Sequence, residues 1–304
     1  MKVVLSFLTV LLPLLYLAVF LAYVWVLRGA GTAARELSTR LAAVTVLVHV
    51  TALVIHGVYL GRLPLGSPLE FCSAMALALL ATYLVLECRS RIKETGFLIS
   101  GLAFLLQFLS SSFGTFEPDI DPLLRDPGYA GHAVFVLLAY TALTLSFVYA
   151  TLYLVQVRQI VRRRFGLLFR RLPALEMLER MSVGAVELGV PLLFVALCLG
   201  HLWMYDLADR VDPQLARRLT PWDPKILISW VIFLGYAAGL VGHRFWGWRG
   251  RRMNIAAIAA YVTVVVTTGL VHHLVPTFHD FTSLPAGLLL VPALLTSGPG
   301  GGAP

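Results

Sequence analysis

The stretch YAGHAVFVLLAYTALTLSFVYATLYLVQV, residues 129–157, decides the fold class of this chain. It contains no Asp, Glu, Lys or Arg over its whole length. A helix needs about 20 consecutive apolar residues to cross a hydrocarbon core of about 30 Å. Since this stretch exceeds that length without a single formal charge, we expect it to cross a membrane as one long helix.

Further apolar stretches on both sides of this one predict additional membrane spans. The first of these stretches, residues 3–27, is too long for a signal peptide, and no small-residue cleavage site follows it before Arg28. The sequence therefore predicts an all-α, polytopic membrane helix bundle of about eight transmembrane helices. The other seven expected spans are 3–27, 41–60, 69–86, 96–113, 184–205, 226–243 and 254–275.

The composition agrees with a membrane protein. The chain has 304 residues, of which 59% are hydrophobic and only 13% charged, too few charges for the solvated surface of a soluble protein. This excludes a soluble enzyme, a disordered chain and a free nucleic-acid binder, so we expect the lipid bilayer as a partner and no nucleic acid. Three Cys without a C-x-x-C spacing exclude a disulfide framework, a thiol redox pair and a covalent haem attachment site.

The distribution of Lys and Arg between alternate loops predicts the orientation in the membrane. The loops after spans 1, 3, 5 and 7 hold 17 of the 24 Lys and Arg, and the other side holds 7. By the positive-inside rule, both termini are extracytoplasmic. The basic segment 158–180 is interpreted as a stop-transfer flank that includes a short amphipathic helix on the inner leaflet. We expect one transmembrane domain, 1–283, and an apolar, then Gly/Pro-rich C-terminal tail, 284–304.

Histidine is the unusual residue in so apolar a chain, because an ionisable group within a span faces the bundle interior and is a functional candidate. His132 is expected at the outer end of span 5, and His279 just beyond the outer end of span 8. Two imidazoles from separate elements on one face suit the axial positions of a haem iron. The cations proposed for the haem propionates are Arg210, Arg217, Arg218 and Lys225. The eight histidines are His49, His56, His132, His201, His243, His272, His273 and His279.

One region, 222–252, carries a resemblance to a known family. It contains WDPK at 222–225, His243 at the end of the next span, and GWRG at 247–250. The segment PTFHDF at 276–281 continues the pattern. In these motifs the chain resembles the cytochrome c assembly family of haem-handling membrane proteins, of the CcsA/CcmC type, and most closely its eight-span CcsA-like and HemX-like members.

The resemblance implies roles for individual residues. His132, after Gly131, and His279 match the two external axial ligands of the haem iron. His243 matches a membrane-embedded histidine that receives haem from inside, and Trp222 and Asp223 match the end of a tryptophan-rich haem platform. His56 matches a histidine of HemX-like members. Asp223 also precedes Pro224, as an N-cap does at the start of a helix.

The resemblance implies a membrane protein of cytochrome c biogenesis that binds haem b transiently and presents it to apocytochrome c, with a CcsB-like assembly subunit as a further partner. The expected location is the bacterial cytoplasmic (inner) membrane. The chain lacks nucleophile chemistry, so it is at most the haem-presenting part of a haem lyase or synthase. Only Trp222-Asp223 of the tryptophan-rich pattern is intact. Two alternatives therefore stay open: a HemX-like membrane regulator of haem synthesis, and a membrane scaffold that has lost haem binding.

Overall fold

The computed structural model describes residues 1–114, 122–210 and 220–274, with side chains at all of these positions except 122, 123 and 268–274. Every regular element in these ranges is a helix. The elements are α1 (Lys2–Leu27), α2 (Thr32–Leu60), α3 (Pro68–Ser90), α4 (Gly96–Phe113), η1 (Pro122–Arg125), α5 (Pro127–Val161), α6 (Leu167–Arg171), α7 (Leu175–Ala208), α9 (Pro224–Phe245) and α10 (Arg251–Leu274).

The all-α membrane bundle predicted from the sequence is confirmed. Among the described residues, the seven helices α1, α2, α3, α4, α5, α7 and α9 are long and apolar enough to cross a membrane. The long helix α10 occupies the place predicted for the eighth span. The proposed tail, 284–304, lies outside the described residues, and the orientation of the termini stays a prediction.

Three helix starts in this bundle use the same local device, an N-cap followed by proline. Ser67, Asp126 and Asp223 precede Pro68, Pro127 and Pro224, and each side chain accepts a hydrogen bond from the first turn of its helix. Proline suits this position because its missing N–H would have no partner in the helix and its φ is already helical. The predicted N-cap role of Asp223 is thereby confirmed.

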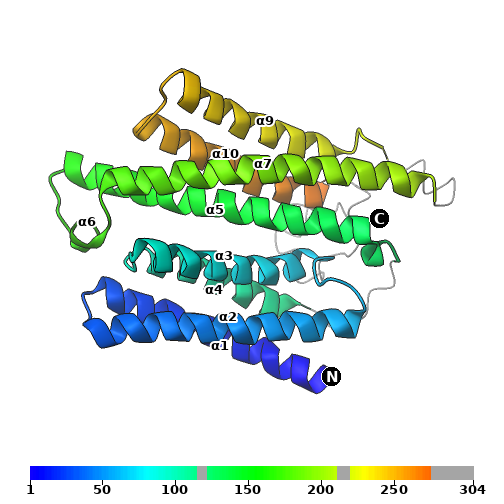
Figure 1. Cartoon of the computed structure of the whole chain (residues 1–304), viewed down its shortest axis with the longest axis horizontal. Coiled ribbons are helices and arrows are strands. Elements are labelled where there is room, and N and C mark those ends of the chain that lie inside the picture. Colours follow the sequence, from blue (N-terminus) through cyan, green and yellow to red (C-terminus); the bar gives the residue numbers. More distant parts are fainter. Residues whose placement is uncertain (115–121, 211–219, 275–304) are drawn as a thin grey trace, which may run out of the picture.

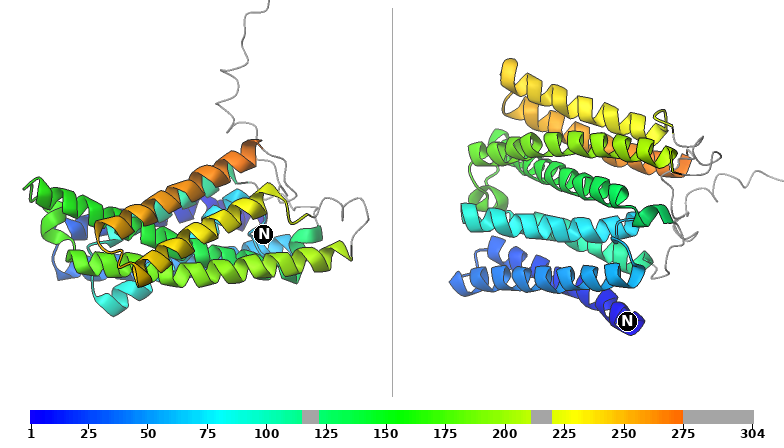
Figure 2. Two further views of the ribbon diagram at one scale, coloured as in Figure 1. Left: turned by 90° about the horizontal axis from the view of Figure 1, so that it is seen from above. Right: turned by 45° about the vertical axis from the view of Figure 1, so that its right-hand side comes forward.

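The long helices form two groups that lie side by side (Figure 1). We call α1–α4 the first half, and α5, α7, α9 and α10 the second half. In the second half α5 and α7 pack along most of their length, and α10 packs against both α5 and α9. The halves meet mainly where α3 packs against α5, and the right-hand view of Figure 2 shows the same order of layers.

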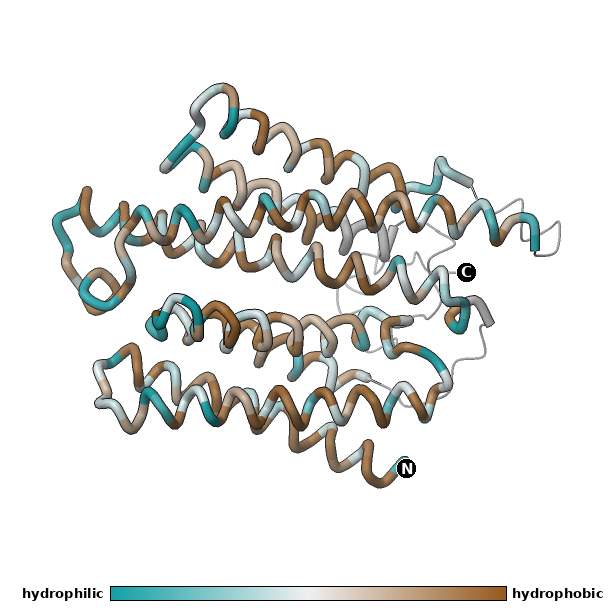
Figure 3. Tube along the Cα trace, in the orientation of Figure 1, coloured by the Kyte–Doolittle hydropathy of each residue, from teal (hydrophilic) through white to brown (hydrophobic). Residues whose placement is uncertain are grey.

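The alternation of the long helices gives the bundle two ends of different character. We call the end that carries His56, His132 and His201 the histidine end. The other, the basic end, consists of the loops 28–31, 91–95, 162–174 and 246–250 with the helix termini beside them. Hydrophilic residues gather at the ends, while hydrophobic residues run along the helices between them (Figure 3). The histidine end is the one that the charge count assigns to the outside.

The basic segment 158–180 differs in part from the amphipathic helix expected there. Only α6 forms as a separate short helix, and Leu167 on it is exposed. Leu172 and Leu178 are instead buried in the core of the protein. These two leucines of the segment thus pack against the bundle.

Candidate functional site

The first turn of α5 is held in place from three directions, and this fixes the helix that carries His132. Asp126 caps the turn, its carboxylate accepting a hydrogen bond from the backbone N–H of Gly128 at 2.7 Å. The Trp203 ring of α7 lies against Gly128 so closely that a Cβ there would be 2.4 Å from a ring carbon. The Tyr129 hydroxyl donates to the carbonyl oxygen of Leu65 at 3.0 Å.

The His132 ring is oriented by the backbone of α7. Its Nδ1 lies 2.8 Å from the carbonyl oxygen of Ala196. Because a carbonyl only accepts, Nδ1 carries the proton, and the lone pair of the neutral ring is on Nε2. Gly200 provides room for the ring, since a Cβ at that position would be only 2.8 Å from Nδ1. A backbone carbonyl that fixes the tautomer in this way is the usual support of a metal-binding histidine.

A second histidine of the same end, His201, was not assigned a role from the sequence. Its Nδ1 lies 2.8 Å from the carbonyl oxygen of Leu197 one turn earlier, and its Nε2 accepts from the Trp230 indole N–H at 3.5 Å. The His201 and Trp230 rings meet edge to face, with centroids 5.8 Å apart. The only signal for His201 in the sequence was its place near the end of an apolar span, directly after Gly200.

Trp222 and Asp223 lie at the start of α9, also at the histidine end. The Asp223 side chain is 4% exposed and accepts from the backbone N–H of Lys225 at 2.9 Å. Trp222 is 75% exposed. The capping role of Asp223 accounts for its burial, whereas Trp222 makes little contact with the described part of the bundle and is accessible to a ligand or to lipid.

Arg210, one of the cations considered for the haem propionates, has carboxylate partners of its own. Its guanidinium lies 3.1 Å from the Asp126 carboxylate and also contacts Asp206. This ion pair ties the end of α7 to the start of α5. Arg217 and Arg218 lie outside the described residues.

His243 lies in the last turn of α9, at the basic end and thus far from His132 along the bundle. Its Nδ1 lies 2.7 Å from the carbonyl oxygen of Trp248, so the lone pair of the neutral ring is again on Nε2. The Trp248 ring packs on Gly242, where a Cβ would be 2.7 Å from it. The loop after α9 thereby folds back and orients this histidine.

His56 lies in the first half and lines a pocket whose walls come from α1–α4 and their connections. Glu70, which also lines this pocket, has a structural role. Its two carboxylate oxygens accept from the Arg62 guanidinium at 2.8 and 3.0 Å, and one of them also accepts from the backbone N–H of Gly66. The side chains of Arg62 and Glu70 are 3% and 10% exposed, so this is a buried ion pair.

His279 lies outside the described residues, so its distance from His132 stays a prediction. The neighbouring position of spans 5 and 8, which that prediction needs, is confirmed. α5 and α10 are in contact, Thr144 and Tyr261 share a hydrogen bond of 2.7 Å, and the rings of Phe147 and Tyr261 stack with centroids 4.7 Å apart.

The described residues of the second half fit one side of a haem site. They supply, at the histidine end, an imidazole with its lone pair on Nε2. In the ranges that the structure describes, no cluster of three or more His, Cys, Asp or Glu forms a metal site.

Comparison with known proteins places these features in a family. The family model "Cytochrome C assembly protein" matches residues 11–279. The inner membrane protein YpjD of Escherichia coli is 26% identical over 233 residues, which cover 73% of this chain and 82% of YpjD. Protein HemX of Bacillus subtilis is 31% identical over 106 residues, 35% of this chain and 36% of HemX. The cytochrome c biogenesis protein CcsA of Gloeobacter violaceus is 29% identical over 119 residues, 38% of this chain and 32% of CcsA. The match extends over most of the eight-helix bundle, and the chain belongs to the cytochrome c assembly protein family.

Proposed function

We propose that this protein binds haem b transiently at the histidine end and presents it to apocytochrome c during cytochrome c biogenesis. The axial ligands are His132 and His279. The observation that carries the proposal is the hydrogen bond from His132 Nδ1 to the Ala196 carbonyl, because it puts the lone pair on Nε2, the state in which imidazole binds a metal. The family match and the CcsA relative support the link to cytochrome c biogenesis.

The other residues of the histidine end act as positioning groups. The Asp126 cap, the Trp203–Gly128 contact and the Tyr129–Leu65 hydrogen bond fix the start of α5, so that His132 keeps one direction. Bound haem supplies the vinyl groups that react with the cysteine thiols of the partner. The task of this chain is to hold and orient them, since fixed geometry by itself lowers a reaction barrier.

His243 is proposed as the entry site for haem from the basic end. The Trp248 carbonyl fixes its proton on Nδ1, as Ala196 does for His132. Since the loop charges assign the basic end to the cytoplasm, haem that enters near His243 would move along the second half towards His132. Trp222, exposed beside the capped start of α9, is proposed to cover one edge of the ring.

The proposed setting follows from the same features. The YpjD relative is an inner membrane protein, and we place this chain in the bacterial cytoplasmic (inner) membrane with both termini outside. The proposed partners are apocytochrome c and a CcsB-like subunit. His56 belongs to the other half of the bundle, so its proposed role in cofactor binding is separate from the axial pair.

A second function, a HemX-like regulator of haem synthesis, is favoured by the HemX match over 106 residues and by the loss of most of the tryptophan-rich pattern. A scaffold without haem is the third alternative. The three proposed functions differ in whether the purified protein contains haem and in whether haem is attached to apocytochrome c.

The test is the absorption spectrum of the purified full chain. We expect a low-spin haem spectrum that is lost in His132→Ala and in His279→Ala and is partly restored by added imidazole. His201→Ala is the matched control, because this neighbouring histidine has the same Nδ1–carbonyl bond but is not a proposed ligand. Loss of the spectrum in His201→Ala but not in His132→Ala would overturn the assignment. A wild-type protein without haem would favour the scaffold, and haem binding without attachment to apocytochrome c would favour the regulator.

A further inference from the structure

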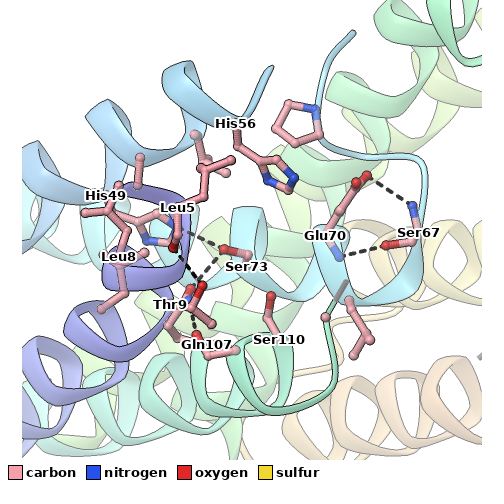
Figure 4. Close-up of a pocket in the computed structure, with 17 residues that line it drawn as sticks. Leu5, Leu8, Thr9, His49, His56, Ser67, Glu70, Ser73, Gln107 and Ser110 are labelled. Atoms are coloured by element: carbon pink, nitrogen blue, oxygen red, sulfur yellow. Dashed lines mark hydrogen bonds between the residues drawn. The ribbon is translucent and has the colours of Figure 1, made fainter. Parts of the chain in front are cut away.

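The first half contains a pocket that the proposed axial pair, His132 and His279, does not use, although His56 lines it. It lies near the histidine end between α1, α2, α3 and α4 and is partly open to the surroundings (Figure 4). None of its lining residues belongs to α5, α7, α9 or α10, so it is distinct from the proposed axial haem site.

One wall of the pocket is apolar and is formed by α1. Leu5, Leu8 and Leu12 face into it from successive turns, and Leu53 of α2 adds to the same surface. The opposite face of α1 carries the exposed residues Val3, Phe7, Val10 and Leu14. In a membrane that face meets lipid, so α1 separates the pocket from the bilayer by the thickness of a single helix.

The opposite wall is polar and carries a hydrogen-bonded chain from all four helices. Ser73 Oγ donates to Gln107 Oε1 at 2.9 Å, so Ser73 must accept from His49 Nε2 at 3.0 Å. His49 therefore carries its proton on Nε2, and Nδ1 accepts from the Tyr16 hydroxyl at 2.8 Å. At the other end, Gln107 Nε2 donates to Ser111 Oγ at 3.0 Å. Every bond thus runs in one direction, from Tyr16 to Ser111.

This direction makes Ser111 the terminal donor. Its hydroxyl accepts from Gln107, and within the part of the chain that the structure describes its own proton has no acceptor. Ser111 lines the pocket, as does its neighbour Ser110. Successive hydrogen bonds polarise one another, which strengthens the last donor of the chain. The polar wall therefore offers a hydrogen bond to an oxygen acceptor inside the pocket.

The charges on the pocket wall favour an uncharged occupant. The only carboxylate that lines it, Glu70, is bound at both oxygens by Arg62. That guanidinium is thereby already paired with a carboxylate, and a phosphate or a propionate in the pocket would compete with Glu70 for it. A neutral molecule would bring no further charge into this buried region.

We propose that this pocket binds an uncharged, lipid-soluble molecule with a carbonyl oxygen, of the quinone class. The carbonyl oxygen accepts from Ser111, and the ring lies against Leu5, Leu8 and Leu53. A rigid ring also loses less conformational entropy on binding than an acyl chain does, which favours a quinone over a lipid ester carbonyl. This site is separate from the proposed axial pair and adds a second ligand to the protein.

The experiment uses the full chain in nanodiscs of zwitterionic lipid, a photoreactive azidoquinone with a short tail, and mass spectrometry of the labelled peptides. We expect label on residues 5–12 or 107–114, displaced by excess unlabelled quinone but not by diacylglycerol, an uncharged lipid ester. Ser111→Ala should weaken quinone binding about 2- to 10-fold, the effect of one neutral hydrogen bond.

The matched pair of variants is Leu8→Trp, which fills the pocket, and Leu14→Trp, which adds the same ring on the exposed face of α1, where Leu14 is 58% exposed. Only Leu8→Trp should abolish labelling, with the thermal stability of both variants unchanged. Label on the second half, equal labelling of the two variants, or displacement by diacylglycerol would overturn the proposal. Labelling of a protein that binds no haem would reject the haem function alone.

Discussion

The substitution Gly200→Ala tests the orientation of His132 without touching the histidine. A Cβ at residue 200 would lie 2.8 Å from His132 Nδ1 and 2.9 Å from Cε1, whereas ordinary contact begins near 3.4 Å. The ring must therefore retreat by about 0.6 Å from α7. Its bond to the Ala196 carbonyl, 2.8 Å long, would lengthen beyond the normal range for a hydrogen bond.

The expected effect falls on haem binding far more than on folding. Loss of the hydrogen bond costs about 1 kcal/mol, and Ala is favoured over Gly inside a helix by about the same amount. The free energy of unfolding should thus change by less than about 1 kcal/mol. Removal of the group that orients a metal-binding histidine, in contrast, typically lowers affinity about 10- to 100-fold.

The assay is haem titration of the purified protein, followed by its absorption spectrum, with thermal unfolding measured on the same samples. Gly184→Ala is the control, because it lies on the same helix and a Cβ there would meet nothing within 4 Å. This control should bind haem like the wild type. If Gly200→Ala also bound haem with wild-type affinity, His132 would not act through the geometry described, and the axial role assigned to it would be refuted.

Four other changes test separate features of the bundle. A reporter fused after Pro304 should be active only outside the cytoplasm; cytoplasmic activity would reverse the assigned orientation. Asp223→Ala removes the cap of α9 and should lower the free energy of unfolding, measured by thermal unfolding, by about 0.5–2 kcal/mol; Asp223→Asn should retain most of the wild-type stability. Glu70→Ala breaks a buried ion pair and should lower the free energy of unfolding by about 3–5 kcal/mol. Glu36→Ala breaks an exposed pair with Arg40 and should lower it by at most about 1 kcal/mol. Similar losses of stability in both variants would contradict the argument from burial. His243→Ala should lower the haem content of purified protein with no change in thermal stability, and unchanged content would remove His243 from the haem path.

The helices could be predicted from the sequence because an apolar run of spanning length has few other structures available. The ends of the helices were harder to predict. Span 2 was expected to begin at residue 41, but α2 begins at Thr32, since its first turns carry charged residues that extend beyond the apolar run. The starts of α3, α5 and α9 were easier, because an N-cap followed by proline is a local signal that needs no tertiary context.

The surroundings of the candidate residues could not be predicted, since they depend on contacts between distant segments. Nothing in the sequence near Arg210 indicates that it pairs with Asp126 at the start of another helix. In the same way, the role of Gly200 becomes visible only when the His132 ring is seen against it. Motif spacing identified the histidine, and the packing of α5 against α7 explains how its ring is oriented.

The hydrogen bonds of the histidines separate those suited to bind a metal from those that stabilise the bundle. His49 uses both ring nitrogens, one on Tyr16 and one on Ser73, so it cannot bind an iron without breaking a buried chain. His132 and His243 each donate from Nδ1 to a backbone carbonyl, and that bond fixes the lone pair on Nε2. They lie at opposite ends of the second half, whereas His49 lies deep in the first. Under the proposed function, haem that enters at one end of the second half and is held at the other would encounter histidines in the tautomer that binds iron, while the polar chain of the first half would stay intact for the proposed quinone.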